Sequence, residues 1–193
     1  MKRIALAALG AVDEDVLSAV EEAIPRIFGV DVRRLAPLPD PAYAFDPQRN
    51  QYSSTLVLRD LLGRVPADAL RLIAVTERDL FIPMLNFIFG QAQVPGTVAV
   101  ISAARLRQEF YALRPDAALL RSRGVKEAAH ELGHTFGLVH CSDPQCPMSL
   151  SANVRQVDAK GAALCGTCSM ILQEALAGMR AEAGAETGRG EHR

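Results

Sequence analysis

Three of the four histidines in this 193-residue chain lie in one short run, HELGHTFGLVH, between His130 and His140. His130 and His134 are four residues apart, so on a helix both imidazoles lie on one face and can reach a single metal ion. The extended pattern HExxHxxGxxH adds a glycine and a third histidine at fixed distances and is typical of catalytic zinc sites. The run therefore requires a helix that ends in a turn, and it predicts a metal centre at that turn.

The other positions of the run each have a chemical reason. Glu131 is placed to act as a general base, because zinc lowers the pKa of a bound water from about 15.7 to about 7. Gly137 tolerates a positive φ, so the helix can end there and the chain can reverse. The reversal brings His140 to the same ion and leaves the fourth position open, as catalysis requires. The alternative is a set of solvated or core histidines on an ordinary helix, which does not account for the glycine and the third histidine.

All four cysteines follow the histidines closely, in the segments CSDPQC and CGTC. Two close pairs separated by a longer segment are typical of a tetrahedral zinc site, here with the ligands Cys141, Cys146, Cys165 and Cys168. With four sulfur ligands such a site would bind no water, so its role would be structural. Two alternatives are disulfide bonds, which would suit a secreted protein, and a redox-active CGTC at a helix start. His140 and Cys141 are adjacent, so an extended backbone would direct one ligand to each metal.

The order of apolar runs predicts an α/β (α+β) fold with a mixed, mostly parallel twisted sheet packed with helices. Strands are expected over 3–9, 30–35, 70–76 and 97–102, and helices over 13–27, 54–62, 119–138 and 168–179. Pro25 is expected to kink or end the first helix. The other segments are expected to be a loop at 42–53, strand or loop at 80–93, a short helix at 103–113, and irregular chain from 142 to the last helix.

No repeat or linker divides the sequence, so residues 1–180 are expected to form one domain, and 181–193, with almost no large apolar side chain, a disordered tail. The formal net charge of -1 gives no electrostatic argument for a nucleic acid or membrane partner. The opening MKRIALAALGAV resembles a signal peptide, but its short apolar run leads straight to Asp13 without a small-residue cleavage site, so a first strand is expected. A cytoplasmic location is the default expectation for such a chain, and the protein is expected to be a monomer.

Taken together, the motifs resemble those of the archaemetzincins, a branch of the metzincin peptidases found in archaea and some other organisms. The matching residues are His130, Glu131, His134, Gly137 and His140, followed by Cys141, Cys146, Met148, Cys165 and Cys168. The resemblance implies a metzincin-like fold with a long active-site helix and two zinc ions, one catalytic on the histidines and one structural on the cysteines. It also implies that Glu131 is the base and that Met148 lies beneath the catalytic metal. An ordinary core methionine is the alternative for Met148.

The motif and the resemblance together predict a zinc-dependent metallopeptidase acting on a peptide or protein substrate. One alternative is a zinc-containing peptide-binding protein with little or no proteolytic turnover, because no tyrosine follows Met148 and the first half of the chain supplies no second acid. A purely structural two-zinc domain is a further alternative, which the open coordination position disfavours. Substrate specificity is expected from residues 37–53, from 80–93 and from the edge strand above the helix.

Overall fold

The computed structural model describes residues 2–188, and its centre is a five-stranded sheet with the strand order β2-β1-β5-β8-β7. Four strands are parallel, namely β1 (Arg3–Ala8), β2 (Val32–Arg34), β5 (Ala69–Thr76) and β8 (Val98–Ser102). At one edge, β7 (Gly90–Ala92) pairs antiparallel with β8. The prediction of a mixed, mostly parallel sheet packed with helices is confirmed.

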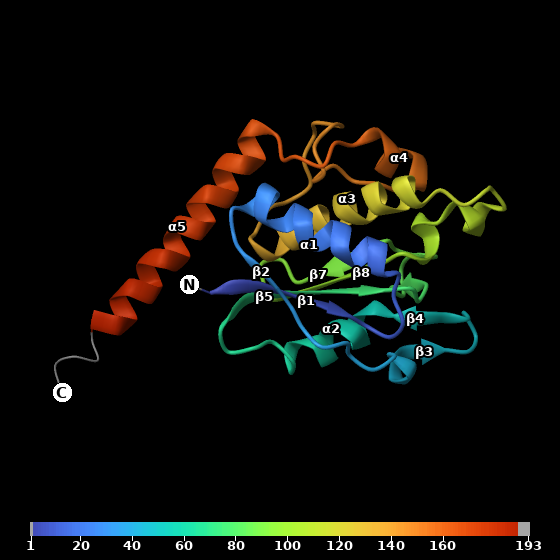
Figure 1. Ribbon diagram of the computed structural model, residues 1–193, viewed down its shortest axis with the longest axis horizontal. Helices are drawn as coiled ribbons and strands as arrows, with labels where there is room; N and C mark the ends of the chain where they lie inside the picture. The colour runs from blue at the N-terminus through green and yellow to red at the C-terminus, as the bar shows by residue number, and fades with distance from the viewer. Residues whose placement is uncertain (1, 189–193) are drawn as a thin grey trace.

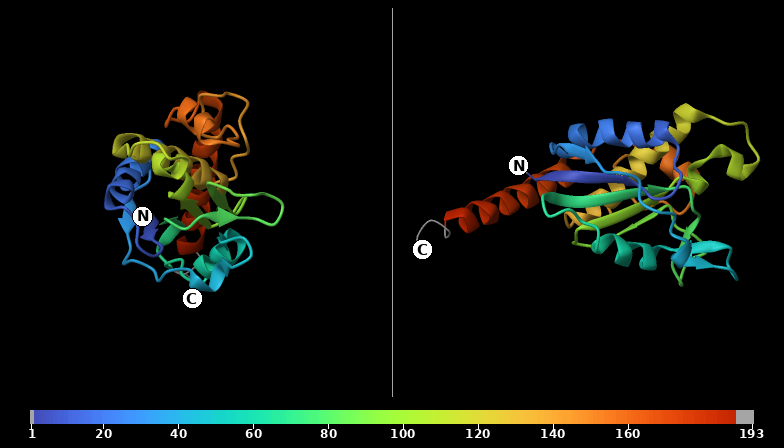
Figure 2. Two further views of the ribbon diagram at one scale, coloured as in Figure 1. Left: turned by 90° about the vertical axis from the view of Figure 1, so that its right-hand side faces the viewer. Right: turned by 60° about the horizontal axis from the view of Figure 1, so that its bottom comes forward.

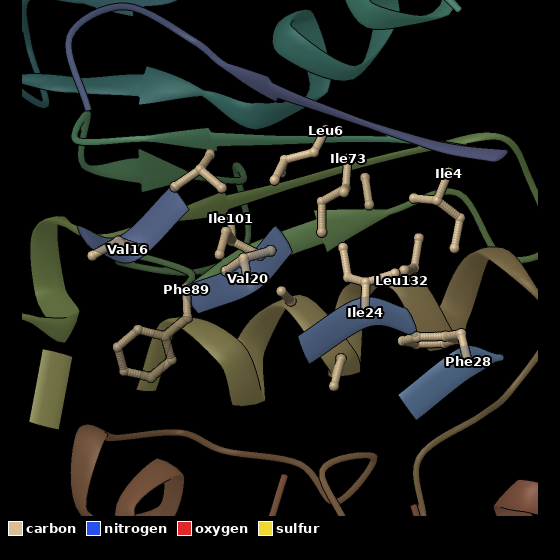
Figure 3. Close-up of a cluster of buried hydrophobic side chains, with 14 of the residues drawn as sticks. Ile4, Leu6, Val16, Val20, Ile24, Phe28, Ile73, Phe89, Ile101 and Leu132 are labelled. Atoms are coloured by element: carbon tan, nitrogen blue, oxygen red, sulfur yellow. The ribbon is translucent and has the colours of Figure 1, made fainter. Parts of the chain in front are cut away.

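Helices cover both faces of this sheet. α1 (Glu14–Phe28) and α3 (Ala117–Thr135) lie on one face, and α2 (Ser54–Leu62) lies on the other (Figure 1). Alternate residues of a strand face opposite sides, so Ile4 and Leu6 of β1 pack with α1, whereas Ala5 and Ala7 pack on the α2 side. Figure 3 shows the larger of these cores, in which Val16, Val20, Ile24 and Phe28 follow one another along α1 and Ile24 lies beside Leu132 of α3. Packing against the central sheet thereby fixes the position of α3.

α1 continues through Pro25, so the prediction that this proline ends or kinks the helix at that point is wrong about the end. The helix runs to Phe28 and stops at Gly29, which has φ 65° and donates its N–H to the carbonyl of Pro25 at 3.0 Å. Pro25 itself is exposed, while Ile24 and Phe28 are buried in the core. Burial of these two side chains holds the last turn although proline removes one hydrogen bond.

Several short elements differ from the expected ones. Residues 42–53, expected as a loop, contain the 3-10 helix η1 (Ala42–Ala44) and two strands of a second, three-stranded sheet with the order β3-β4-β6. Its strands are β3 (Phe45–Asp46), β4 (Gln51–Ser53) and β6 (Leu80–Phe81). The short helix expected over 103–113 is instead two 3-10 turns, η2 (Ala104–Leu106) and η3 (Gln108–Tyr111). These runs are too short for their periodicity to be visible in the sequence.

The C-terminal part also departs from the expected layout. α3 ends at Thr135 instead of residue 138, and α4 (Val154–Ala159) lies in a segment expected to be irregular. α5 (Gly166–Gly188) is longer than expected and projects beyond the sheet (Figures 1 and 2). It therefore covers 181–188, where a disordered tail was expected, and residues 189–193 lie outside the described residues. Across residues 2–188, no helix combines the length and apolar character needed to cross a membrane.

Candidate active site

The end of α3 places the histidine run. Gly137 has φ 90°, and its N–H donates to the carbonyl of His134 at 2.9 Å, while Leu138 N–H donates to the carbonyl of Gly133 at 3.2 Å. These two bonds form a Schellman motif, in which a residue with positive φ stops the helix. The expected role of Gly137 as the point of reversal agrees with this geometry. The chain then returns along the helix toward His140.

The three histidines meet beside this turn. The ligand nitrogens of His130, His134 and His140 all lie within 4.8 Å of one another, and His140 is the exposed member of the group. The ring centroids of His130 and His134 are 4.6 Å apart, and those of His134 and His140 are 5.1 Å apart. The sequence thus correctly predicted which residues converge.

Hydrogen bonds fix the tautomers of the two helical histidines. The Nδ1–H of His130 donates to the carbonyl of Pro147 at 2.8 Å, and that of His134 donates to the carbonyl of Leu138 at 2.7 Å. Burial lowers the pKa of His130 to about 3, with the Lys160 charge adding to the effect, and burial also lowers the pKa of His134. Both rings are therefore neutral, and each Nε2 carries a lone pair.

The distance between the two Nε2 atoms indicates whether a cation fits between the rings. They lie 3.1 Å apart with no proton to share between them, so their lone pairs repel unless a positive ion lies in front of both. Two nitrogens at about 2.0–2.1 Å from a tetrahedral zinc would be roughly 3.4 Å apart, which is close to this separation. Neutral imidazoles whose other nitrogen bonds to a carbonyl are also the usual zinc ligands. The histidine group fits a zinc ion.

Glu131 shares the cleft with the histidines and is almost fully buried. Burial raises the pKa of Glu131 well above its usual value, the nearby Glu127 raises it further, and Lys160 opposes both. A β-carbon placed on Gly90 of β7 would lie 2.5 Å from Cγ and 2.8 Å from Oε1 of Glu131. The carboxyl group therefore lies directly against the edge strand, and only a glycine at position 90 leaves it that space.

Met148 packs against α3 at Gly133. It is fully buried, and a β-carbon placed on Gly133 would lie 2.5 Å from its Sδ atom. The backbone carbonyls of Pro147 and Met148 contact the histidine and the cysteine group. The Pro147 carbonyl accepts the His130 hydrogen bond, and the Met148 carbonyl accepts one from Cys141 N–H at 3.0 Å. The segment that carries Met148 therefore contacts residues of both the histidine and the cysteine group through its backbone.

The four cysteines form a second group, with their sulfur atoms within 4.8 Å of one another. All four are free thiols, and the separation of 3.8 Å between Cys141 Sγ and Cys165 Sγ is too long for the roughly 2.05 Å of a disulfide bond. A backbone N–H at Cys168 lowers the pKa of Cys165, whereas burial raises those of Cys146 and Cys168. One convergent group of four, instead of two separate pairs, fits a tetrahedral zinc.

A cleft of about 530 Å³ opens over the histidine group. Its lining includes residues 85–92 and Val94, which contain β7, and also Leu150, Ser151 and Ala152. Side chains of α3, His140 and Lys160 complete the lining. Leu85, Val94 and Leu150 are large apolar side chains that remain more than half exposed here. These three side chains give part of the cleft lining an apolar character.

Several residues around the site were not identified from the sequence. Gly133 and Gly90 matter through what approaches them in space, and Glu127 and Lys160 line the cleft as a buried pair of opposite charge, 3.8 Å apart. Gly133 lies inside the HELGH motif, so its small size was a usable signal. The other three had no such signal, because their contacts join segments that are distant in the sequence.

Comparison with known proteins agrees with this geometry. The sequence pattern of peptidase family M54 matches residues 48–174. The archaemetzincin of Methanocaldococcus jannaschii is 38% identical over 172 residues, covering 89% of this chain and 93% of the relative. That of Pyrococcus furiosus is 43% identical over 174 residues, covering 87% and 91% of the two chains.

Solved structures give the same result. The crystal structure of archaemetzincin from Methanopyrus kandleri has a TM-score of 0.80 and 36% identity, covering 91% of this chain and 95% of that one. A zinc-dependent peptidase from Methanocorpusculum labreanum also has a TM-score of 0.80, with 34% identity and coverage of 88% and 99%. The predicted resemblance is confirmed: this chain belongs to the archaemetzincins, peptidase family M54, a family of zinc metallopeptidases.

Proposed function

We propose that this chain hydrolyses peptide bonds at a metzincin-type centre in which His130, His134 and His140 hold a catalytic zinc and Glu131 is the general base. The observation that carries the proposal is the pair of Nε2 lone pairs 3.1 Å apart, with Glu131 next to them in the same cleft. Three imidazole ligands leave the fourth coordination position for water or substrate, as catalytic zinc sites require.

When bound, zinc supplies Lewis acidity, which polarises a substrate carbonyl and lowers the pKa of water. The Glu131 carboxylate takes a proton from the attacking water and later gives it to the leaving amine. Burial raises the pKa of Glu131, so its carboxyl group holds a proton more firmly than an exposed carboxyl group does between the two steps. The wall formed by Gly90 holds the carboxyl group in place and limits its rotation.

The edge strand β7 is proposed to bind the substrate main chain. β7 is at the end of the sheet order, so its outer edge has unpaired N–H and C=O groups, and Gly90, Gln91 and Ala92 all line the cleft. An extended peptide can add to such an edge as a further strand, with its side chains entering neighbouring pockets. This arrangement would place a peptide bond above His130 and His134.

A second zinc, on Cys141, Cys146, Cys165 and Cys168, is proposed to be structural, which gives two zinc ions per chain. Four thiolate ligands leave no position for water, so the ion would link the start of α5 to the segment that follows the histidines. Met148 is proposed to support the catalytic site from below, in keeping with its contact with Gly133.

We further propose that residues 1–180 act as one catalytic domain and that the protein works as a monomer without a nucleic acid partner. Strands β1, β5 and β8 of one sheet contribute side chains to both hydrophobic clusters, which supports a single unit. Four free thiols are also easiest to maintain in a reducing compartment, which favours the cytoplasm.

The test replaces Glu131 with glutamine and measures zinc content, folding and peptide cleavage together. Glu131→Gln is expected to keep both zinc ions and the fold while losing cleavage, because the amide cannot accept the proton. Exposed Glu22→Gln serves as the matched control and is expected to cleave normally. Undiminished cleavage by zinc-loaded Glu131→Gln would remove the base assignment.

A peptide library separates this proposal from a binding protein with little turnover. Zinc-loaded wild-type protein is expected to yield cleaved products that a chelator abolishes. Peptides that are retained but never cut would favour the binding protein instead.

A further inference from the structure

The carbonyl oxygen of Pro147 accepts two hydrogen bonds. One comes from Nδ1 of His130 at 2.8 Å and the other from Nζ of Lys160 at 3.1 Å. A carbonyl has two lone pairs, so these two donors satisfy it completely. The Lys160 side chain is only 1% exposed, so its ammonium group is buried beside Pro147 and does not project into solvent.

A counter-charge accompanies Lys160. Its Nζ lies 3.8 Å from Oε1 of Glu127, which is itself buried and accepts no hydrogen bond at that atom. Glu127 is three residues before His130, so both side chains lie on the same side of α3. A buried ammonium is tolerated only when it is paired and hydrogen-bonded, and Glu127 and Pro147 together supply these partners.

The backbone reinforces the contact. The N–H of Gly161, next to Lys160, donates to the carbonyl of Gln145 at 2.8 Å, so the chain after α4 contacts the 145–147 segment at two points. We propose that Lys160 is a positioning residue that, through the Pro147 carbonyl, fixes the ring of His130 in the orientation needed to bind the metal. This inference rests on the proposed role of His130 as a zinc ligand.

Outer partners of this kind orient a metal-binding histidine, and losing one typically weakens metal binding 10- to 100-fold. Without Lys160 the carbonyl of Pro147 would be free to tilt toward other donors. The His130 ring would then lose the fixed acceptor that determines both its tautomer and its angle. The effect should be confined to the histidine site.

Lys126 provides a matched control. It is also buried, and its Nζ donates to the carbonyls of Val157 at 3.2 Å and Asp158 at 3.0 Å. It therefore attaches α4 to α3 without contacting Pro147. A substitution there removes a similar buried cation and loosens the same helix, so it reports any general structural effect.

The experiment compares Lys160→Met with Lys126→Met by chelator competition for zinc and by cobalt substitution. Thiolate-to-cobalt charge-transfer absorption reports the cysteine site, and the weaker visible bands report the histidine site. Lys160→Met is expected to lower the zinc affinity of the histidine site roughly 10-fold or more while leaving the cysteine signal unchanged. Lys126→Met is expected to leave both unchanged, and Lys160→Arg, which keeps a charged donor, to retain most of the affinity.

The double variant Glu127→Gln/Lys160→Met decides between two causes. It removes the buried carboxylate that Lys160→Met leaves unpaired, but it does not restore the donor to Pro147. Affinity that stays low supports the positioning role, and affinity that returns to the wild-type value overturns it. If Lys160→Met alone does not fold, the zinc affinity of the double variant is compared directly with that of the wild-type protein.

Failure of the inference is distinguishable from failure of the proposed function. Wild-type protein that binds no zinc sensitive to His130→Ala would contradict the proposed function itself. Wild-type protein that binds such zinc, with Lys160→Met equal to Lys126→Met, would contradict only the role of Lys160.

Discussion

The sulfur of Met148 packs so closely against Gly133 that a β-carbon at position 133 would lie 2.5 Å from Sδ and 3.2 Å from Cε. Met148 is fully buried, so its side chain has little space into which it can move. We therefore expect Gly133→Ala to destabilise the protein by about 1–3 kcal/mol, as overpacked cores usually do. The measurement is urea unfolding of the zinc-loaded protein.

Gly178→Ala is the control for this substitution. Gly178 is also inside a helix, but nothing lies within 4 Å of the position that a β-carbon would take there, so alanine should stabilise α5 by about 0.5–1 kcal/mol. Two glycines in helices are thus expected to respond with opposite signs. Equal stabilisation at both would show that Met148 does not constrain position 133.

Gly90→Ala should reduce catalysis more than stability. The added methyl group would lie 2.8 Å from Oε1 of Glu131 and 2.8 Å from the carbonyl of Val100, so the carboxyl group must move. A displacement of about 1 Å can cost about 100-fold in rate, and we expect a loss of that order in kcat. Gly63→Ala, whose nearest atom is 3.5 Å away, should leave kcat unchanged. Equal kcat values for the two variants would contradict the positioning of Glu131 by β7.

Metal removal should proceed in two steps. The histidine group is open to the cleft and includes the exposed His140, whereas Cys146 and Cys168 are buried. A mild chelator is therefore expected to remove one zinc together with activity, while the thermal unfolding midpoint changes little. Zinc addition should restore cleavage. Loss of both ions at the same chelator concentration would contradict the separation into catalytic and structural sites.

Asp158→Ala should destabilise the fold strongly. Arg123 is almost fully buried and contacts both carboxylate oxygens of Asp158 at 2.7 Å, so the substitution leaves a buried cation without its partner. The expected cost is about 3 kcal/mol. Asp68→Ala breaks the exposed pair with Arg33 and should cost less than about 1 kcal/mol. Denaturant unfolding of both variants measures the difference, and similar costs would show that burial does not determine the strength of these pairs.

The parts of the fold and site that sequence could predict were those governed by local geometry. The four-residue spacing of His130 and His134 places both rings on one helix face, and Gly137 allows the reversal that brings in His140. The apolar runs that became β1, β5 and β8 are long enough to be recognised as buried strands. Each of these inferences needs only residues that are close together in the chain.

The parts that could not be predicted depend on distant contacts. β3 has two residues and pairs with β4 around a turn, so no periodicity marks it. α1 passes Pro25 because Phe28 is buried against the core, which a local rule about proline does not include. Lys160 has no recognisable pattern around it, and its importance appears only when the carbonyl of Pro147 is located.

His140 and Cys141 belong to different ligand groups although a single peptide bond joins them. An insertion of even one residue between them would shift Cys141 relative to His140. The histidine group and the cysteine group could then no longer both bring their ligand atoms together. We therefore expect the peptide bond between His140 and Cys141 to tolerate no insertion or deletion. A change in chain length at this point is therefore expected to disturb both ligand groups at once.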